Sequence, residues 1–198
     1  MTQIDVYFST LSPFTYLAGL RLEGVAAKHG ATVNYKPMDI MGLFGRTGGT
    51  PPGQRHPNRQ EWRLLDMERS AKKLGMPINL KPAHWPTNPA PSCYAIIAAQ
   101  ASGADVGELI HGFTTACWAE ERDISSDEVV RDVLTAAGLD PALADKDMLG
   151  SAEQYTKNTD DAVAAGVFGA PTYITDTGAR FWGQDKIEDL DLHLSGKL

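Results

Sequence analysis

The sequence predicts an α/β protein whose strands lie near the two ends of the chain and whose middle is helical. Strand-like segments occur at residues 4–8 and 31–40, and a hairpin is expected at residues 173–182. Residues 93–165 between them carry helical patterns. A chain of 198 residues is long enough for one well-cored domain with a subdomain inserted in it.

The first strand is followed by a predicted helix and a second strand. Residues 4–8 alternate apolar and polar side chains, as a short strand does. A single helix is expected next, because Pro13 follows Ser12 at the helical position where its missing N–H costs nothing. The helix should end at Gly30, and residues 31–40 should form a strand parallel to the first. Helical spacing places three residues on one packed face of this helix: Leu17, Leu20 and Gly24.

The middle of the chain is expected to combine Gly- and Pro-rich connections with helices. Residues 42–58 hold so many glycines and prolines that no regular structure is expected there. Loops of that length are usually functional or mobile. A helix is predicted at residues 59–74, followed by a second Pro-rich connection at residues 75–92.

Two helix starts are predicted in the helical block. Ser125 with Glu128 has the spacing of a capping box, in which each side chain satisfies a main-chain donor of the other. Ser151 with Gln154 repeats this spacing before another helix. The last segment returns to strands, with a turn at residues 176–178 inside the hairpin and a terminal helix after it.

The order β-α-β, helical block, β-β-α predicts a thioredoxin-like core with an all-helical domain inserted in its middle. We expect residues 1–45 and 150–198 to form the thioredoxin-like domain. Residues 46–149 are expected to form the inserted helical domain with its Pro- and Gly-rich loops.

Composition argues against several classes of function. The net charge of −7 disfavours nucleic-acid and anionic-membrane binding, since both need a basic surface. No apolar run approaches the roughly 18 residues that span a bilayer, and no basic leader is visible, so a cytoplasmic protein is expected. Cys93 and Cys117 form no CxxC motif and are expected to be buried thiols. The five histidines are scattered, so no metal site is expected.

Three motifs occur in order along the chain: SPFTYLA after the first strand, VFGAPTY before the hairpin and FWGQDKIEDL after it. Together they resemble the 2-hydroxychromene-2-carboxylate isomerases, which are relatives of the kappa-class glutathione transferases and lie beside the bacterial disulfide oxidoreductases. The resemblance covers nearly the whole chain. It implies glutathione as a cofactor and a small aromatic substrate, and by analogy a homodimer.

The turn Ser12-Pro13-Phe14-Thr15 stands where thioredoxin-like oxidoreductases carry CxxC. Without the cysteine pair, disulfide exchange is excluded. The start of a helix still favours an anion, and a hydroxyl placed there can stabilise the thiolate of a bound thiol. The alternative is that Ser12 is only an N-cap.

The resemblance also implies a glutathione site around the other two motifs. It implies a cis peptide bond at Ala170-Pro171, which the residues alone would not predict, with Ala170 pairing to the cysteinyl backbone of glutathione. By analogy Asp185 takes the γ-glutamyl ammonium, and Gln184 with nearby N–H groups takes the carboxylate. The alternative role of Asp185 is that of a helix cap, and both roles are compatible. The implied glutathione-binding residues are Ser12, Ala170, Pro171, Trp182, Gly183, Gln184 and Asp185.

The two Pro-rich connections are expected to complete the substrate site with Asn58, Arg59 and Trp85. Arg59 suits an anionic group, since arginine grips carboxylates bidentately, or it is a solvated surface charge. Trp85 offers a face to a bicyclic ligand, or it packs in the core. Gly49 stands where relatives commonly carry an asparagine, which removes one polar contact that the resemblance implies.

Three functions remain open from the sequence. The first is a glutathione-dependent isomerase, in which the thiolate adds to an unsaturated aromatic oxo-acid, the adduct opens and rotates, and the thiol leaves. The second is a kappa-like glutathione transferase that leaves the thiol attached to an electrophile. The third is a non-catalytic ligand-binding relative. The isomerase is preferred because FWGQD and the TYLA continuation are closer to that family.

Overall fold

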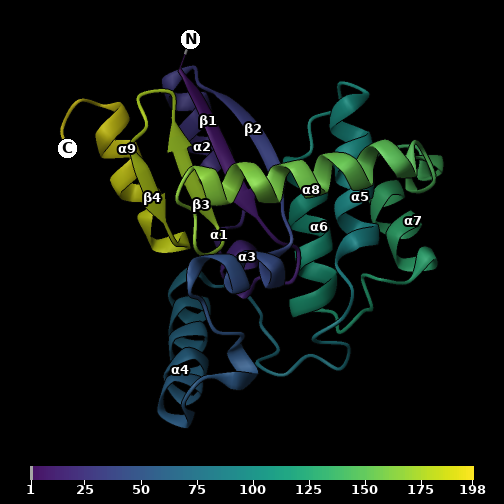
Figure 1. Ribbon diagram of the computed structural model, residues 1–198, viewed down its shortest axis with the longest axis horizontal. Helices are drawn as coiled ribbons and strands as arrows, with labels where there is room; N and C mark the ends of the chain where they lie inside the picture. Colours follow the sequence, from purple (N-terminus) through teal and green to yellow (C-terminus); the bar gives the residue numbers. More distant parts are fainter. Residues whose placement is uncertain (1) are drawn as a thin grey trace.

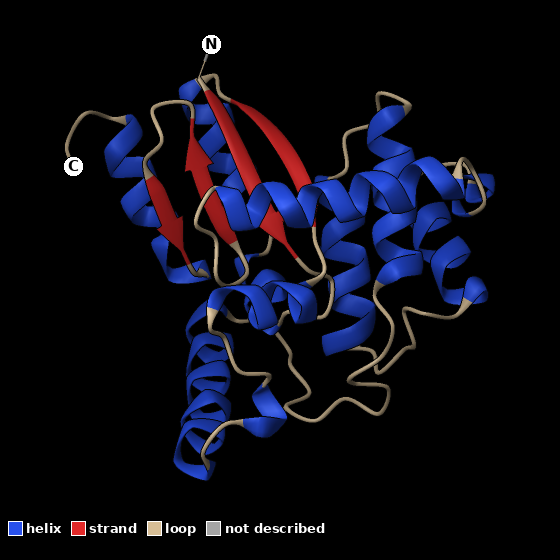
Figure 2. Cartoon of the chain, viewed as in Figure 1, coloured by secondary structure: helices blue, strands red, loops and turns tan. Residues whose placement is uncertain are grey.

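The computed structural model describes residues 2–198, which form one four-stranded sheet surrounded by helices (Figures 1 and 2). The sheet order is β2-β1-β3-β4. Figure 1 shows α8 crossing one face of the sheet and α2 on the other. Helices α5, α6 and α7 gather beside the β2 edge, and α4 projects away from the sheet.

The sheet confirms the predicted fold class. Strand β1 (Gln3–Phe8) pairs in parallel with β2 (Thr32–Pro37) and antiparallel with β3 (Thr172–Thr175). The hairpin partner β4 (Arg180–Trp182) is antiparallel to β3. The chain therefore has the β-α-β and β-β-α halves of a thioredoxin-like core, with helices between them.

The predicted single helix after β1 is wrong, because the chain forms two helices, α1 (Pro13–Ala18) and α2 (Arg21–His29). Gly19 separates them with φ 55° and ψ −139°, a conformation that side chains with a Cβ rarely adopt. The Arg21 side chain donates to the last carbonyl groups of α1 at 2.9 and 3.2 Å. Gly24 is exposed, so the predicted packed face does not continue into α2.

Part of the segment predicted to lack regular structure is also helical. Helix α3 (Ile40–Thr47) begins at Asp39, whose side chain accepts the Met41 N–H at 3.0 Å. Ile40 and Leu43 lie one turn apart and are both buried. Burial of this face outweighs the helix-weakening effect of the two glycines in the segment.

The remaining helices follow the predicted block closely. Their bounds are α4 Pro57–Leu74, α5 Ala90–Ala101, α6 Gly107–Trp118, α7 Asp127–Ala136, α8 Met148–Ala164 and α9 Ile187–Leu194, with short 3-10 helices η1 Pro52–Gln54, η2 Pro141–Ala144 and η3 Gln184–Lys186. One apolar cluster joins the sheet to the inserted helices, so the core is continuous. The division of the chain into two domains stays a prediction.

The two predicted capping boxes are wrong. Ser126, not Ser125, precedes α7, and the Ser125 N–H and hydroxyl both donate to Asp123, at 3.0 and 2.7 Å. Ser151 lies inside α8, which begins instead after Asp147, whose carboxylate accepts the Gly150 N–H at 3.2 Å. Asp123 thus engages the Ser125 side chain before α7 begins, whereas Asp147 accepts a main-chain donor of the first turn of α8.

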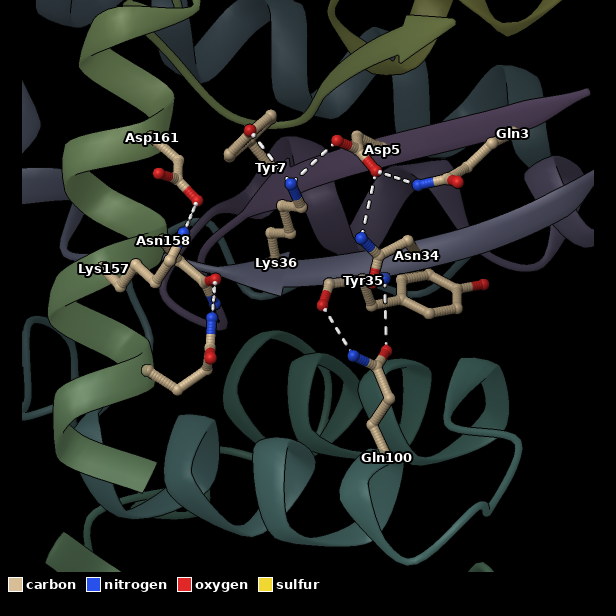
Figure 3. Close-up of polar contacts among 11 residues, drawn as sticks. Gln3, Asp5, Tyr7, Asn34, Tyr35, Lys36, Gln100, Lys157, Asn158 and Asp161 are labelled. Carbon is tan, nitrogen blue, oxygen red and sulfur yellow. Dashed lines mark hydrogen bonds and ion pairs between the residues drawn. The ribbon is translucent and has the colours of Figure 1, made fainter. Parts of the chain in front are cut away.

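The edge of the sheet at β2 is closed by a side chain (Figure 3). The Gln100 amide accepts the Tyr35 N–H and donates to the Tyr35 carbonyl, each at 3.2 Å, as a neighbouring strand would. On the same strand, Lys36 pairs with Asp5 of β1 at 2.8 Å. The Gln100 contacts protect the edge at Tyr35 from pairing with another chain.

Candidate active site

The turn between β1 and α1 is buried and held in place by the start of α5. Ser9 and Thr10 are fully buried. The Thr10 hydroxyl lies 2.9 Å from the Ser92 hydroxyl, and the Leu11 N–H donates to the Ser9 hydroxyl at 3.3 Å. The turn is therefore held in one conformation by buried hydrogen bonds, unlike a loop on the surface.

Ser12 is the N-cap of α1, as one of the two interpretations predicts. Its hydroxyl accepts the Thr15 N–H at 3.2 Å and donates to the Ala170 carbonyl, also at 3.2 Å. The Ala170-Pro171 peptide bond is cis, as the resemblance implies. The first and second motifs, 158 residues apart, thus meet at one hydroxyl group. A role for Ser12 towards a thiolate stays a prediction.

The helix start offers less electrostatic support than predicted, because α1 has only six residues. A macrodipole grows from aligned peptide units, so a short helix contributes less than the helix expected over residues 13–30. The local hydrogen-bond donors of the turn remain, since the first N–H groups of any helix lack partners within it.

The third motif lies beside the second. The Gly183 N–H donates to the Pro171 carbonyl at 2.9 Å, and Gly183 has φ 113°. A Cβ on Gly183 would lie 2.5 Å from an Asp185 carboxylate oxygen, so glycine lets that carboxylate fold over the turn. The Asp185 side chain is exposed. Trp182 is 54% exposed and packs edge-to-face against Phe168.

The Gln184 side chain is used within the protein. Its carbonyl oxygen accepts from Arg21 at 2.5 Å, and its amide nitrogen lies 3.4 Å from the Ser70 hydroxyl. Gln184 is buried, and it joins η3 to α2 and α4. Its carbonyl oxygen is therefore held by Arg21, whereas one of the two amide N–H groups has no hydrogen-bond partner in residues 2–198.

Trp85 lies directly beside the Ser12 turn. Its indole N–H donates to the Leu11 carbonyl at 3.0 Å, and its ring centroid is 5.6 Å from that of the fully buried Trp118. The residue is half-buried, so it packs against the core on one side while remaining accessible. Both roles that the sequence left open are compatible with this position.

Asn58 and Arg59 are exposed in the first turn of α4. Within residues 2–198, no side-chain hydrogen bond or ion pair joins either residue to Ser12, Ala170 or Trp85. A side chain at Gly49, where the resemblance implies an asparagine, would require Phe44 to shift, because a Cβ there would lie 2.5 Å from the Phe44 ring. The Arg55 guanidinium lies over the same ring, 5.7 Å from its centroid.

Arg63, which the sequence did not single out, lies beside Trp85. Its guanidinium carbon lies 5.4 Å from the Trp85 ring centroid and 5.9 Å from that of Trp118. Burial, together with the nearby charge of Arg55, lowers the pKa of Arg63 to about 10. The only sequence signal is its position four residues after Arg59, which puts both on one face of α4.

A small cavity, lined by both apolar and polar side chains, lies behind α1. Its volume is about 30 Å³, and its lining includes Thr15, Glu23, His111 and Tyr173. Each of these four residues has a buried side-chain polar atom without a hydrogen-bond partner. Burial raises the pKa of Glu23 above its ordinary value. A separate hollow of about 670 Å³ beside β2 contains none of the predicted site residues.

Comparison with known proteins agrees with this geometry. A family model described as a DSBA-like thioredoxin domain matches residues 3–195. A 2-hydroxychromene-2-carboxylate isomerase from Sphingobium xenophagum is 32% identical, covering 96% of this chain and 97% of that protein. The chain belongs to the 2-hydroxychromene-2-carboxylate isomerase family of DsbA-like thioredoxin proteins. The family resemblance predicted from the three motifs is confirmed.

Two further similarities concern fold and class. A solved structure of a 2-hydroxychromene-2-carboxylate isomerase superposes with a TM-score of 0.77 at 24% identity, covering 98% of this chain and 95% of that one. A glutathione S-transferase kappa 1 from Caenorhabditis elegans is 28% identical over 41% of this chain and 36% of its own length. The family member described here is an enzyme. No helix in residues 2–198 is long and apolar enough to cross a membrane.

Proposed function

We propose that the protein is a glutathione-dependent isomerase acting on an aromatic unsaturated oxo-acid of the 2-hydroxychromene-2-carboxylate type. The Ser12 hydroxyl, held 3.2 Å from the Ala170 carbonyl at the start of α1, carries this proposal. A relative that spans the whole chain bears the isomerase name, and a kappa-class glutathione transferase supports glutathione as the cofactor. We further propose action in the cytoplasm, where glutathione is abundant and reduced.

The residues around Ser12 fit glutathione. The main chain at Ala170 and Pro171 suits the cysteinyl backbone as a short added strand. The exposed Asp185 carboxylate suits the γ-glutamyl ammonium. The remaining amide N–H of Gln184, together with the main-chain N–H groups at the start of η3 that lack partners within the helix, suits the γ-glutamyl carboxylate. Trp182 forms a wall beside them.

Glutathione, when bound, supplies a thiolate that adds reversibly to an unsaturated carbon of the substrate and leaves unchanged. Ser12 donates its hydroxyl proton as a hydrogen bond to the sulfur, which favours the ionised form. Trp85 covers the turn and presents its ring to the aromatic part of the substrate. Asn58 and Arg59 contact the polar groups of the substrate from the first turn of α4.

The Ser12→Ala variant tests this proposal. We expect glutathione to bind the wild-type protein and to show the ultraviolet absorbance of a thiolate at neutral pH. The alanine variant should lose this absorbance and about a hundredfold in kcat/KM, as when one donor to a developing anion is removed. It should also lose about 1 kcal/mol of stability with the helix cap.

Ser12→Thr is the matched control, because it keeps a hydroxyl at the cap and should retain most of the activity. Calorimetry that detects no glutathione binding, or an alanine variant with unchanged turnover, would contradict the proposal.

A kappa-like glutathione transferase is the second candidate, and the transferase relative favours it. Both activities would use the same thiolate site. Measuring free thiol during turnover separates them: an isomerase leaves the glutathione concentration constant, whereas a transferase consumes one thiol for each product formed. A ligand-binding relative would bind glutathione without turning over any aromatic oxo-acid.

A further inference from the structure

Arg63 projects from α4 towards two tryptophan rings. Its guanidinium carbon is 5.4 Å from the Trp85 centroid and 5.9 Å from the Trp118 centroid. A cation within about 6 Å of an aromatic face is attracted by the ring quadrupole. The two contacts hold the guanidinium in one position. The guanidinium of a solvated surface arginine would be mobile.

The charge of Arg63 has no counter-ion. Within residues 2–198 its guanidinium makes no hydrogen bond and no ion pair, although the chain holds 25 acidic residues. The guanidinium nitrogen atoms are not among the fully buried polar atoms that lack a hydrogen-bond partner, so they remain in contact with solvent. A partly buried charge without a partner is costly. Such a cost is typical of residues kept for binding rather than for stability.

The neighbouring charges have the same sign. The pKa of Arg63 is lowered first by burial and then by Arg55, and the pKa of Arg55 is lowered by burial and by Arg59. These three arginines make no ion pair with an acid in the part of the chain that the structure describes. Their mutual repulsion favours any anion that enters between them.

Arg63 is also close to the chemistry proposed above. The ring beneath its guanidinium, that of Trp85, donates its N–H to the Leu11 carbonyl at 3.0 Å. Leu11 immediately precedes Ser12. An aromatic acid bound against Trp85 would therefore place its ring beside the Ser12 turn and its carboxylate within the range of Arg63.

We propose that Arg63 is a specificity-determining residue that binds the carboxylate of an aromatic acid substrate. The assignment of that acid as the substrate rests on the proposed function. Arg63 has a fixed position beside Trp85, whereas Arg59 is exposed in the first turn of α4, so Arg63 contributes more to the selection of acids. Its planar fork donates two parallel hydrogen bonds to the carboxylate.

The test uses 1-naphthoate and its neutral analogue 1-naphthamide as probes, with binding followed by tryptophan fluorescence and calorimetry. Arg63→Met should weaken naphthoate binding at least tenfold and leave naphthamide binding unchanged. Arg63→Lys should fall between them, because lysine keeps the charge and loses the fork. The melting temperature of Arg63→Met should equal or exceed that of the wild type, since an uncompensated charge is removed.

Arg69→Met is the matched control. Arg69 lies on the same helix, and its guanidinium lies over another tryptophan, Trp62, at 5.5 Å from the ring centroid. This variant should bind both probes as the wild type does. Unchanged naphthoate affinity in Arg63→Met, or an equal loss for the acid and the amide, would overturn the proposal.

The result is independent of the glutathione proposal. Naphthoate binding is measured without glutathione, and Arg63→Met should leave the glutathione affinity unchanged. If the wild type binds naphthoate through Arg63 but does not bind glutathione, the arginine assignment is supported and the isomerase proposal fails. If glutathione binds and Arg63→Met leaves the naphthoate affinity unchanged, the arginine assignment fails and the isomerase proposal stands.

Discussion

The Ser12 hydroxyl is shared between two main-chain groups, the Thr15 N–H and the Ala170 carbonyl. Under the proposed function its proton must turn from the Ala170 carbonyl to a sulfur. The carbonyl would then need another donor, and the cysteinyl N–H of the same ligand is suited to supply it. This exchange would leave no buried acceptor unsatisfied, which is the condition for a low energetic cost.

Glu23 lines the small cavity behind α1, and its burial there can be tested by the pH dependence of stability. Burial raises the pKa of Glu23 and Asp105 raises it further, while hydrogen bonding to Tyr35 and the charge of His111 lower it. The folded state therefore holds the Glu23 proton more strongly than the unfolded chain does. Stability from this group is present below the ordinary pKa of about 4.5 and is lost as the pH rises through the folded pKa.

Glu23→Gln should accordingly stabilise the protein at neutral pH by about 1 kcal/mol, the cost of one desolvated polar group. The advantage should shrink as the pH falls towards the ordinary glutamate pKa. Urea unfolding at neutral and mildly acidic pH measures the difference. Glu153→Gln, at an exposed position of α8, is the control and should show no such trend. A difference that is the same at both pH values would contradict the assignment.

At the scale of single residues, the sequence predicted the cap at Ser12 correctly from local chemistry alone. It did not predict Arg63, because a charged residue in an amphipathic helix looks the same whether it faces water or a tryptophan. It also did not predict that Arg21 and Ser70 engage Gln184. These contacts depend on how α2, α4 and η3 are arranged, and no local pattern reports that arrangement.

At the scale of elements, the errors have two physical sources. Helix α3 forms in a glycine-rich segment because its apolar residues are buried, so tertiary packing overrides local preference there. The helix after β1 breaks at Gly19, whose backbone conformation is one that glycine adopts easily. Strands and long helices were predicted well because their periodic patterns span enough residues.

Gln100 provides a test of how the β2 edge is protected. Gln100→Ala removes both hydrogen bonds to Tyr35 and should cost about 1 to 3 kcal/mol, the penalty for partly buried main-chain groups left without partners. Amide hydrogen exchange at Tyr35 should accelerate correspondingly. Gln54→Ala, at an exposed position of η1, should leave both quantities unchanged. Wild-type exchange at Tyr35 in the Gln100 variant would show that another group closes the edge.

At the scale of the whole molecule, the enzyme has no accessible thiol of its own. Cys93 and Cys117 are free and buried, as predicted, and burial raises the pKa of Cys93 to about 11 and that of Cys117 to about 12. A high pKa and burial both suppress thiolate reactivity. Thiol chemistry at Ser12 would therefore need a thiol from outside the chain.

A thiol-reactive chromogenic disulfide should consequently leave the native protein unlabelled and react with both cysteines after denaturation. The denatured sample serves as the internal control for reagent and protein concentration. Rapid labelling of either cysteine in the native state would mean that the region around it opens readily. That cysteine could then take part in the thiol chemistry.

The arginine group on α4 has a consequence for how charged molecules reach the enzyme. The chain carries a net charge of −7, so an anion is repelled at long range, whereas Arg55, Arg59 and Arg63 attract it at short range. At about 0.1 M salt the Debye length is roughly 10 Å. Salt therefore weakens the repulsion between distant charges more than the attraction between an anion and a partly buried guanidinium in contact with it. Association of acidic metabolites should therefore tolerate, and initially profit from, moderate ionic strength.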